Sequence, residues 1–278
     1  MTQHAAISDR DFAAVQRFVY REIGVSLSDA KKALVVSRLA SRLRALEIAS
    51  YRDYVARAEH DSAERQHFID SITTNETRFF REQPQFELLR NVTMPSWRAA
   101  ADEGLRARST RIWSAGCSSG EEPYSIAMLL QELLPAAEGW SHELMATDIS
   151  SRVVAKAAAG IYPIARKEEI PLPLLKRFML RGVGAREGMI SVTSEIRNLV
   201  RFSSLNLNDA AAYPNGVFDA IFCRNVLIYF DTVSRQRVLD ALVARLAPGG
   251  MLFLGHAESL SRRGDVRTVI PSVYVKLG

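Results

Sequence analysis

The residues best suited to bind a ligand follow a short β-type run at 112–115 (I-W-S-A), near the middle of the chain. Small residues fill positions 116–120 (G-C-S-S-G), and Glu121-Glu122-Pro123 then has the composition of a first helical turn. Proline is tolerated there because its missing N–H would have no intrahelical partner, and acidic side chains suit the positive end of the helix dipole. Small side chains also let a ligand approach the backbone closely.

The charges in this stretch indicate which ligand it would bind. The glycine turn matches neither G-x-G-x-x-G nor a P-loop, and the two glutamates that follow would repel a phosphate. They would suit a cationic ligand instead. The alternative is a tight turn followed by an exposed acidic first turn that binds nothing, and this stretch alone leaves both interpretations open.

A strand, a tight turn and a helix towards residue 134 make the first βα unit of a doubly wound sheet, in which ligands bind at the carboxyl ends of the strands. A second buried strand is predicted at 143–148, with a helix at 150–159 after it. That strand ends in Asp148, whose carboxylate can accept hydrogen bonds from both hydroxyls of a ribose. A surface acid is the alternative.

The parallel pattern resumes in the C-terminal part. We expect a buried strand at 218–223 that ends at Arg224 and Asn225, a helix at 233–246, a strand at 251–255 and an edge strand at 273–276. The α/β rhythm is lost between 160 and 207, where short strands at 176–180, 188–192 and 199–203 predict a small antiparallel insertion. Insertions on α/β folds often select partners.

Residues up to about 72 predict a small all-α domain, with helices at 11–19, 30–46, 49–60 and 63–72. Lys31, Arg38 and Arg42 fall on one face of the second helix, and no acidic residue interrupts the stretch from 31 to 44. This basic face has two interpretations, a solvated surface or a docking surface for an acidic protein helix.

Residues 73–82 (T-T-N-E-T-R-F-F-R-E) join the helical part to the rest of the chain. A flexible linker would be rich in Gly, Ser or Pro and would lack aromatic residues. The Phe79-Phe80 pair would attach the segment to a core and hold Asn75, Thr77 and Arg81 in place. A capped helix start is the alternative.

Composition sets further limits. The 278 residues carry a net charge of +5 and a pI near 9.3, which suits an acidic partner but is too weak to indicate nucleic-acid binding. Cys117 and Cys223 suggest neither a disulfide framework nor a zinc site, so we expect buried free thiols. With no signal peptide and no apolar run long enough to cross a membrane, a soluble, cytoplasmic protein is expected.

Five motifs in one order resemble those of a known family: T-T-N-E-T-R-F-F-R-E, W-S-A-G-C-S-S-G-E-E-P-Y-S-I-A, A-T-D-I, F-C-R-N-V-L-I-Y-F-D and L-A-P-G-G-M-L-F-L-G-H-A-E-S-L. Over nearly its whole length the chain is similar to the CheR family of bacterial chemotaxis receptor methyltransferases, which use S-adenosylmethionine (AdoMet). The resemblance implies a Rossmann-like class I methyltransferase domain at 89–278, with the β insertion at about 160–205. A helical domain with the linker motif, at 1–88, precedes it.

The family forms glutamyl methyl esters on chemoreceptor helices and releases S-adenosylhomocysteine (AdoHcy). By resemblance, Arg81 and Tyr229 face the reacting carboxylate, Glu122 meets the positive methionine end of AdoMet and Asp148 meets its ribose. The whole cofactor set implied by the resemblance is Asn75, Thr77, Arg81, Glu122, Asp148, Asn206, Leu207, Cys223, Arg224 and Asn225. A glutamate carboxylate is already ionised at neutral pH and needs no general base, so neither a catalytic triad nor a metal is expected.

The expected partners are chemoreceptor cytoplasmic helices, which would meet the basic face of Lys31, Arg38 and Arg42. A hairpin at 181–184 has the length seen in family members that dock a receptor C-terminal peptide. We expect a monomer that neither binds nucleic acid nor inserts into a membrane. Two alternatives remain: a methyltransferase acting on nucleic acid or on another protein, and a non-catalytic AdoMet sensor.

Overall fold

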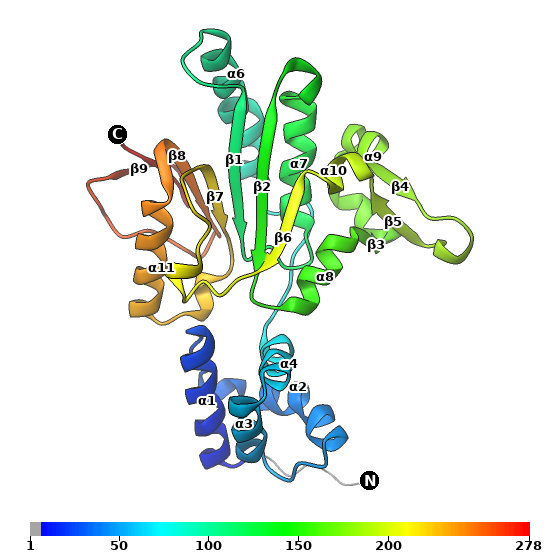
Figure 1. Cartoon of the computed structure of the whole chain (residues 1–278), viewed down its shortest axis with the longest axis vertical. Coiled ribbons are helices and arrows are strands. Elements are labelled where there is room, and N and C mark those ends of the chain that lie inside the picture. Colours follow the sequence, from blue (N-terminus) through cyan, green and yellow to red (C-terminus); the bar gives the residue numbers. More distant parts are fainter. Residues whose placement is uncertain (1–6) are drawn as a thin grey trace.

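The computed structural model describes residues 7–278, which form a helical unit and a larger unit built on a sheet (Figure 1). The helical unit comprises α1 (Asp9–Ile23), the 3₁₀ turn η1 (Asp29–Lys31), α2 (Lys32–Ala45), α3 (Tyr51–His60) and α4 (Ser62–Ile72). The Ser8 side chain caps α1 by accepting a hydrogen bond from the peptide N–H of Asp11, and Gly24 ends the helix in the left-handed conformation. The predicted N-terminal helices are confirmed.

The helical unit has a core of its own. Phe18 meets Phe68 edge to face with 4.8 Å between ring centroids, and Tyr54 stacks on Phe68 at 5.4 Å. Leu39 and Leu43 of α2 are fully buried in the same cluster. These apolar residues recur at helical spacing, so each helix buries one face and leaves the other to solvent.

The larger unit is built on a sheet with the strand order β6-β2-β1-β7-β8-β10-β9. Neighbouring strands from β6 to β8 pair in parallel, whereas β10 runs antiparallel to both β8 and β9. This mostly parallel order confirms the predicted doubly wound α/β class. The strands are β1 (Ser109–Ala115), β2 (Ser141–Asp148), β6 (Val200–Ser204), β7 (Phe218–Cys223), β8 (Leu246–Leu254), β9 (Val266–Ile270) and β10 (Val273–Lys276).

Helices cover both faces of this sheet. The larger-unit helices are α5 (Gln83–Leu88), the π-helical turn η2 (Leu89–Thr93), α6 (Met94–Asp102), α7 (Glu121–Leu133), α8 (Ser151–Ala159) and α11 (Thr232–Ala244). Successive residues of β1 point to opposite faces, so Ile112 joins the core that contains residues of α5, α6 and α7, while Trp113 joins the core that contains residues of α11. Because helices cover the strands on both faces, the buried stretches of the strand sequences are mostly apolar and do not alternate between apolar and polar residues.

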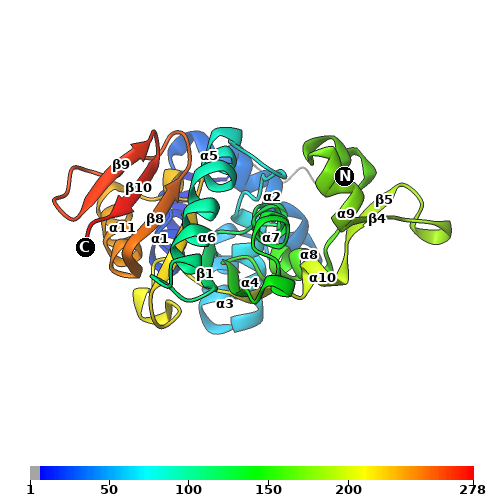
Figure 2. The same ribbon diagram turned by 90° about the horizontal axis from the view of Figure 1, so that it is seen from above.

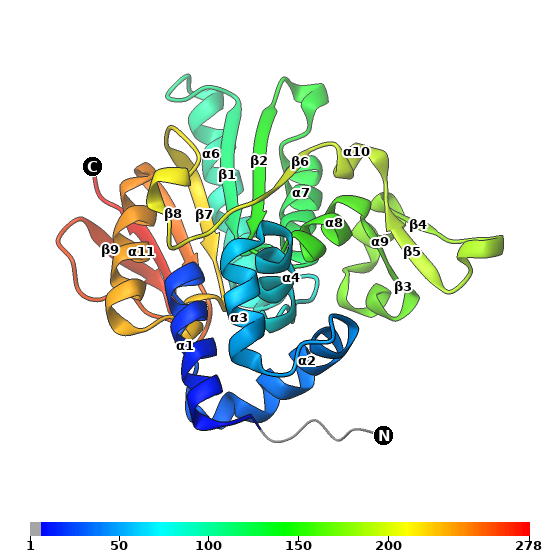
Figure 3. The ribbon, with the colours of Figure 1, turned by 60° about the horizontal axis from the view of Figure 1, so that its bottom comes forward.

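The strand order reverses at β1, because the chain continues to β2 and β6 on one side and to β7 and β8 on the other. Ligands of doubly wound sheets bind outside the carboxyl ends of the strands next to such a reversal. Figures 1 and 3 show that these carboxyl ends point toward the helical unit. The space between the two units is therefore where a ligand site is expected.

A small antiparallel sheet with the order β3-β5-β4 projects from one end of the molecule, opposite β9 and β10 (Figure 2). It contains β3 (Ile161–Pro163), the 3₁₀ segment η4 (Ile164–Glu169), α9 (Leu172–Phe178), β4 (Met179–Arg181), the turn η5 (Gly184–Arg186) and β5 (Met189–Val192). The insertion predicted from the lost α/β rhythm is present. The short helix α10 (Ser194–Arg197) leads back to the main sheet, and the turn η6 (Ala210–Ala212) follows β6.

Three details of the strand prediction are wrong. The strand expected at 176–180 is mostly the end of α9, which starts with a proline in its first turn. The strand expected at 199–203 in the insertion is β6, which pairs in parallel with β2 in the main sheet, so the insertion ends before about 205. The strand at 273–276 is not an edge strand, because β9 covers it; β9 is largely exposed and lacks the apolar pattern that marks a buried strand.

Within residues 7–278, no helix combines the length and the apolar composition needed to span a bilayer. Among the same residues, no cluster of three or more His, Cys, Asp or Glu side chains is arranged to hold a metal ion.

Candidate functional site

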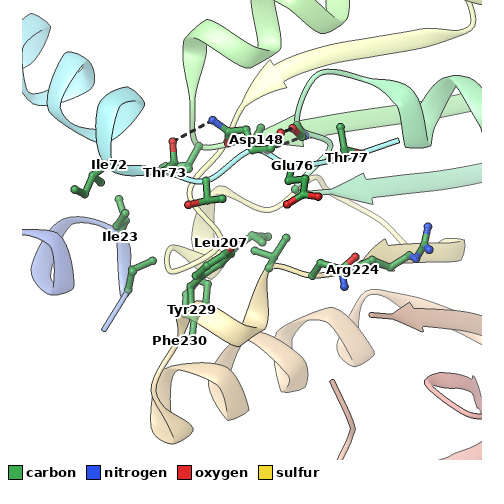
Figure 4. Close-up of a pocket in the computed structure, with 18 of the residues that line it drawn as sticks. Ile23, Ile72, Thr73, Glu76, Thr77, Asp148, Leu207, Arg224, Tyr229 and Phe230 are labelled. Carbon is green, nitrogen blue, oxygen red and sulfur yellow. Dashed lines mark hydrogen bonds between the residues drawn. The ribbon is translucent and has the colours of Figure 1, made fainter. Parts of the chain in front are cut away.

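A cleft of about 1220 Å³, counting the space at its mouth, lies between the helical unit and the carboxyl ends of the strands. The helical side contributes apolar residues such as Ile23 and Ile72, and the strand ends contribute Asp148, Leu207 and Arg224 (Figure 4). The cleft thus combines an apolar wall with a few polar groups, as small-molecule sites commonly do.

The turn after β1 forms one edge of the cleft. Gly116 and Gly120 both have positive φ, and the peptide N–H groups of Gly116 and Cys117 donate to the carbonyl of Thr147. A Cβ on Gly116 would lie 2.3 Å from Val226 Cγ2, so only glycine lets this turn pack against the loop after β7. Cys117 and Cys223 are both buried free thiols, as predicted.

Asp148 lies at the end of β2 and lines the cleft. Its carboxylate accepts hydrogen bonds from the peptide N–H groups of Ser118 at 2.9 Å and Ser150 at 3.0 Å. Burial raises the pKa of Asp148, although these hydrogen bonds oppose the rise. A carboxylate has about four acceptor sites, more than these peptide groups use, so the group is held in place and can still accept from a ligand hydroxyl.

Three charged groups form a buried cluster at the end of β7. Arg224 is 2.9 Å from Glu122 and 3.3 Å from Glu82, and Glu122 also accepts from Ser114 at 2.7 Å. Burial works against the ionisation of Glu82, but the Arg224 charge and hydrogen bonds from His256 and Asn225 lower its pKa. Arg224 is therefore neutralised by two carboxylates and is poorly suited to hold an anionic substrate.

The linker motif lies along the cleft and is attached to the core of the larger unit by Phe79 and Phe80, as predicted. Phe79 is buried against Tyr162 and Phe80 packs against Phe86, both edge to face. Asn75 and Thr77 line the cleft between these anchors and the helical unit. Arg81 also lines it, and its guanidinium donates to the carbonyl of Glu76 at 3.0 Å, which leaves other N–H groups for a ligand.

The loop after β7 supplies Asn225 and Tyr229 to the cleft. Tyr229 ends the 3₁₀ turn η7 (Leu227–Tyr229) and is half-buried, so it is not a core tyrosine. Asn206 and Leu207, after β6, line the same cleft. Cys223 does not: its thiol is fully buried in the α11-side core, because strand alternation points it away from the cleft, and burial raises its pKa.

The structure does not bring Lys31 of η1 and Arg38 and Arg42 of α2 together as one free surface. Arg38 donates to the carbonyls of Ile72 and Thr73 at 2.7 and 2.8 Å, and Arg42 forms an ion pair with the buried Glu64. Both arginines thus bind parts of their own chain, which a helical-wheel projection cannot reveal. Lys31 is exposed and lines the cleft.

Two glutamates that the sequence analysis did not single out also hold this site together. Glu82 accepts hydrogen bonds at 3.2 Å from the Asn225 side chain and from the peptide N–H of His256. Glu258 accepts from peptide N–H groups of the loop after β7. Both belong to motifs quoted above, but Glu82 stands between Arg81 and Gln83 and Glu258 stands between Ala257 and Ser259, so no local pattern distinguishes them from surface acids.

The chain matches two family models, one for each of its units. A family model described as "CheR methyltransferase, SAM binding domain" matches residues 75–275, and one described as "CheR methyltransferase, all-alpha domain" matches residues 10–73. The chain is 43% identical over 265 residues to "Chemotaxis protein methyltransferase 2" of Pseudomonas aeruginosa, covering 95% of this chain and 92% of that protein. It is 41% identical to "Chemotaxis protein methyltransferase" of Salmonella typhimurium, covering 94% and 88% respectively.

Solved structures give a weaker likeness. PKMT2 from Rickettsia typhi in complex with AdoHcy aligns with a TM-score of 0.34 and 15% identity, over 53% of this chain and 21% of that one. A likeness this low carries no argument, so the fold assignment depends on the strand order and the family models.

Proposed function

Because this chain belongs to the CheR methyltransferase family, we propose that it transfers the methyl group of AdoMet to glutamate side-chain carboxylates of chemoreceptors. The products are glutamyl methyl esters and AdoHcy. The observation that carries the proposal is the cleft at the reversal of strand order, which Asp148, Glu122 and Arg81 all line.

The residues of the cleft fit AdoMet. The fixed carboxylate of Asp148 suits the ribose hydroxyls, and Glu122 offers negative charge to the cationic methionine end. Asn206 and Leu207 provide an amide and an apolar wall for the adenine, and Asn75 and Thr77 close the site from the linker. Cys223 contributes only from behind the site, as part of the strand that carries Arg224 and Asn225. When bound, AdoMet supplies a sulfonium-activated methyl group.

Little chemistry is then required of the protein. The substrate carboxylate is ionised at neutral pH, so the site must align it and exclude water. Arg81 has N–H groups free to orient the carboxylate by charge-assisted hydrogen bonds, while Arg224 is held by Glu82 and Glu122. Tyr229 adds a hydroxyl and an aromatic wall. We assign Arg81 and Tyr229 to positioning the reacting carboxylate.

The proposed partner is the cytoplasmic helix of a chemoreceptor. We propose that this chain binds it as a monomer. Lys31, at the mouth of the cleft, is the cation best placed to steer an acidic helix. A receptor C-terminal peptide would add to the edge strand β4, where Leu180 is exposed, next to the exposed Val183 of the turn that follows.

The test is transfer of tritiated methyl groups from AdoMet to receptor-containing membranes. Glutamyl methyl esters release methanol in mild base, whereas N-methyl groups on proteins or nucleic acids do not. Base-labile counts on a receptor-sized band support the proposal. Base-stable counts, counts on added DNA or RNA, or AdoHcy binding without any transfer would assign one of the alternative functions.

A further inference from the structure

The loop after β7, residues 224–230, carries five cleft residues, namely Arg224, Asn225, Val226, Tyr229 and Phe230. Within the loop itself, the peptide N–H of Tyr229 reaches the carbonyl of Val226 at 3.2 Å, and that of Phe230 reaches the carbonyl of Leu227 at 3.1 Å. Asn225 has a φ of 60°, in the left-handed region. The remaining peptide N–H groups need partners from elsewhere, since an unpaired buried donor is costly.

Glu258 provides the partner for three of them, the N–H groups of Asn225, Leu227 and Ile228. One carboxylate oxygen accepts from the N–H of Leu227 at 2.7 Å and of Ile228 at 3.3 Å. The other accepts from the N–H of Asn225 at 2.9 Å and of Gly255 at 2.6 Å. Glu258 is only 4% exposed. A carboxylate suits this place because it offers acceptors on both oxygens and because hydrogen bonds to a charged group are the stronger kind.

Gly255 shows how closely the end of β8 approaches this loop. A Cβ at that position would lie 2.7 Å from the Asn225 peptide nitrogen and 2.8 Å from the nearer carboxylate oxygen of Glu258. From the linker side, Glu82 holds the Asn225 side chain and the N–H of His256. The loop is thus fixed to the segment after β8 by a buried group that does not itself line the cleft.

We propose that Glu258 is a positioning residue for methyl transfer, which holds the peptide N–H groups of the loop so that Tyr229 and Asn225 face the cleft. The proposal rests on the proposed function, because it gives these two residues their roles at the reacting carboxylate and at AdoMet. Most proposed AdoMet contacts lie outside the loop, at Asp148, Glu122 and the segment after β6. Loss of the carboxylate should therefore impair turnover more than binding.

The test uses the full chain with Glu258→Gln, which keeps the size of the side chain but points N–H donors at peptide N–H groups. We expect kcat to fall by about tenfold or more, since small displacements at a reacting centre are costly, with a much smaller change in AdoHcy affinity. Amide hydrogen exchange of residues 224–230 in the free protein should become faster. Glu143→Gln is the matched control: Glu143 is hydrogen-bonded to Arg111 near the start of β2, whereas the cleft lies at the carboxyl ends of the strands.

Two further variants keep the proposal testable if Glu258→Gln folds poorly. Gly255→Ala should reproduce the low kcat and the faster exchange. Its methyl group would collide with the peptide nitrogen of Asn225 and with a carboxylate oxygen of Glu258, although the Glu258 side chain is still present. In a double-mutant cycle, Glu258→Gln should cost little once Tyr229→Phe is present, because coupled residues are not additive.

An unchanged kcat with unchanged exchange, equal losses in the Glu143→Gln control, or additive losses in the cycle would each overturn the proposal. If instead the parent protein methylates no receptor, the proposed function fails, and the exchange measurement still tests whether Glu258 holds the loop.

Discussion

The peptide N–H of Ser26 donates a 2.9 Å hydrogen bond to the carbonyl oxygen of Tyr229, and beside it Val25 and Phe230 form an isolated antiparallel bridge. The helical unit therefore contacts the backbone of the loop that carries a proposed catalytic residue. On the other side of the cleft, Gln66 of α4 donates at 3.0 Å to the carbonyl of Ile149, just after β2. The helical unit is thus part of the wall of the site as well as a candidate docking surface.

Removing the Ser26 donor should disturb the site from the helical side. Ser26→Pro eliminates the N–H, so we expect a lower kcat with a smaller change in AdoHcy affinity. Ser26→Ala keeps the N–H and should behave like the parent. Steady-state kinetics and calorimetry on both variants decide the matter, and equal behaviour of the two would show that the bridge does not position the loop.

Asp148→Ala should weaken AdoHcy binding. Loss of a buried acceptor of ligand hydrogen bonds costs about 1–3 kcal/mol, which is roughly a 5- to 150-fold rise in Kd. Calorimetry measures it, and circular dichroism checks that the variant is folded. An unchanged Kd in the folded variant would remove Asp148 from the ribose site.

The raised pKa of Asp148 predicts opposite pH trends for binding and stability. The ionised form accepts from ribose hydroxyls, so affinity should fall as pH decreases through the folded-state pKa, which lies above the ordinary aspartate value of about 3.9. The folded state holds this proton more tightly than the unfolded chain does. The stability due to this group is therefore fully present below the ordinary aspartate pKa and is lost as pH rises through the folded-state pKa. Asp148→Asn should flatten both pH trends. If AdoHcy affinity in that variant depended on pH as steeply as in the parent, the assignment of Asp148 to the ribose would be wrong.

Arg81→Ala and Tyr229→Phe should lower methyl transfer without a comparable loss of folding. We expect kcat to fall on the order of tenfold or more in each, since both position the reacting carboxylate. Arg81→Lys should recover only part of the activity, because an ammonium group cannot hold a carboxylate with a planar pair of N–H donors. Parent-like turnover of both Arg81→Ala and Tyr229→Phe on a receptor substrate would show that these assignments are wrong.

The basic residues of η1 and α2 should separate into two classes. Lys31→Glu should raise the receptor KM and flatten its dependence on salt, because an exposed charge mainly steers encounter. Arg42→Ala should instead lower the free energy of unfolding by about 1–3 kcal/mol, since it leaves the buried Glu64 without its ion pair. Arg44→Ala, at an exposed position of the same helix, is the stability control. If the receptor KM does not depend on salt and is unaffected by Lys31→Glu, Lys31 belongs to an ordinary solvated surface and does not steer the receptor.

Local pattern was enough to predict much of this molecule. Residues 112–115 and 218–223 are apolar runs because their strands are covered on both faces, and the small residues at 116–120 are required where Gly116 passes within contact distance of Val226. Asp148 could be placed in the site because a strand end is a defined location in a doubly wound sheet.

Other features depend on contacts between distant residues and leave no local trace. Arg38 and Arg42 look like a free basic face until the carbonyls after α4 and the carboxylate of Glu64 are brought against them. Cys223 and Arg224 are adjacent, yet one is in the core and the other in the cleft, because strand alternation separates them. Glu258 is 31 residues away along the chain from Leu227, whose N–H it accepts.

The separate cores of the two units have a spectroscopic consequence. All three tryptophans of the chain, Trp97, Trp113 and Trp140, pack in the cores of the sheet unit, while the helical core contains tyrosines such as Tyr54. Tryptophan emission therefore reports on the sheet unit alone, and far-ultraviolet dichroism reports on both. Comparing the two signals during unfolding would show whether the helical unit can detach while the sheet remains intact.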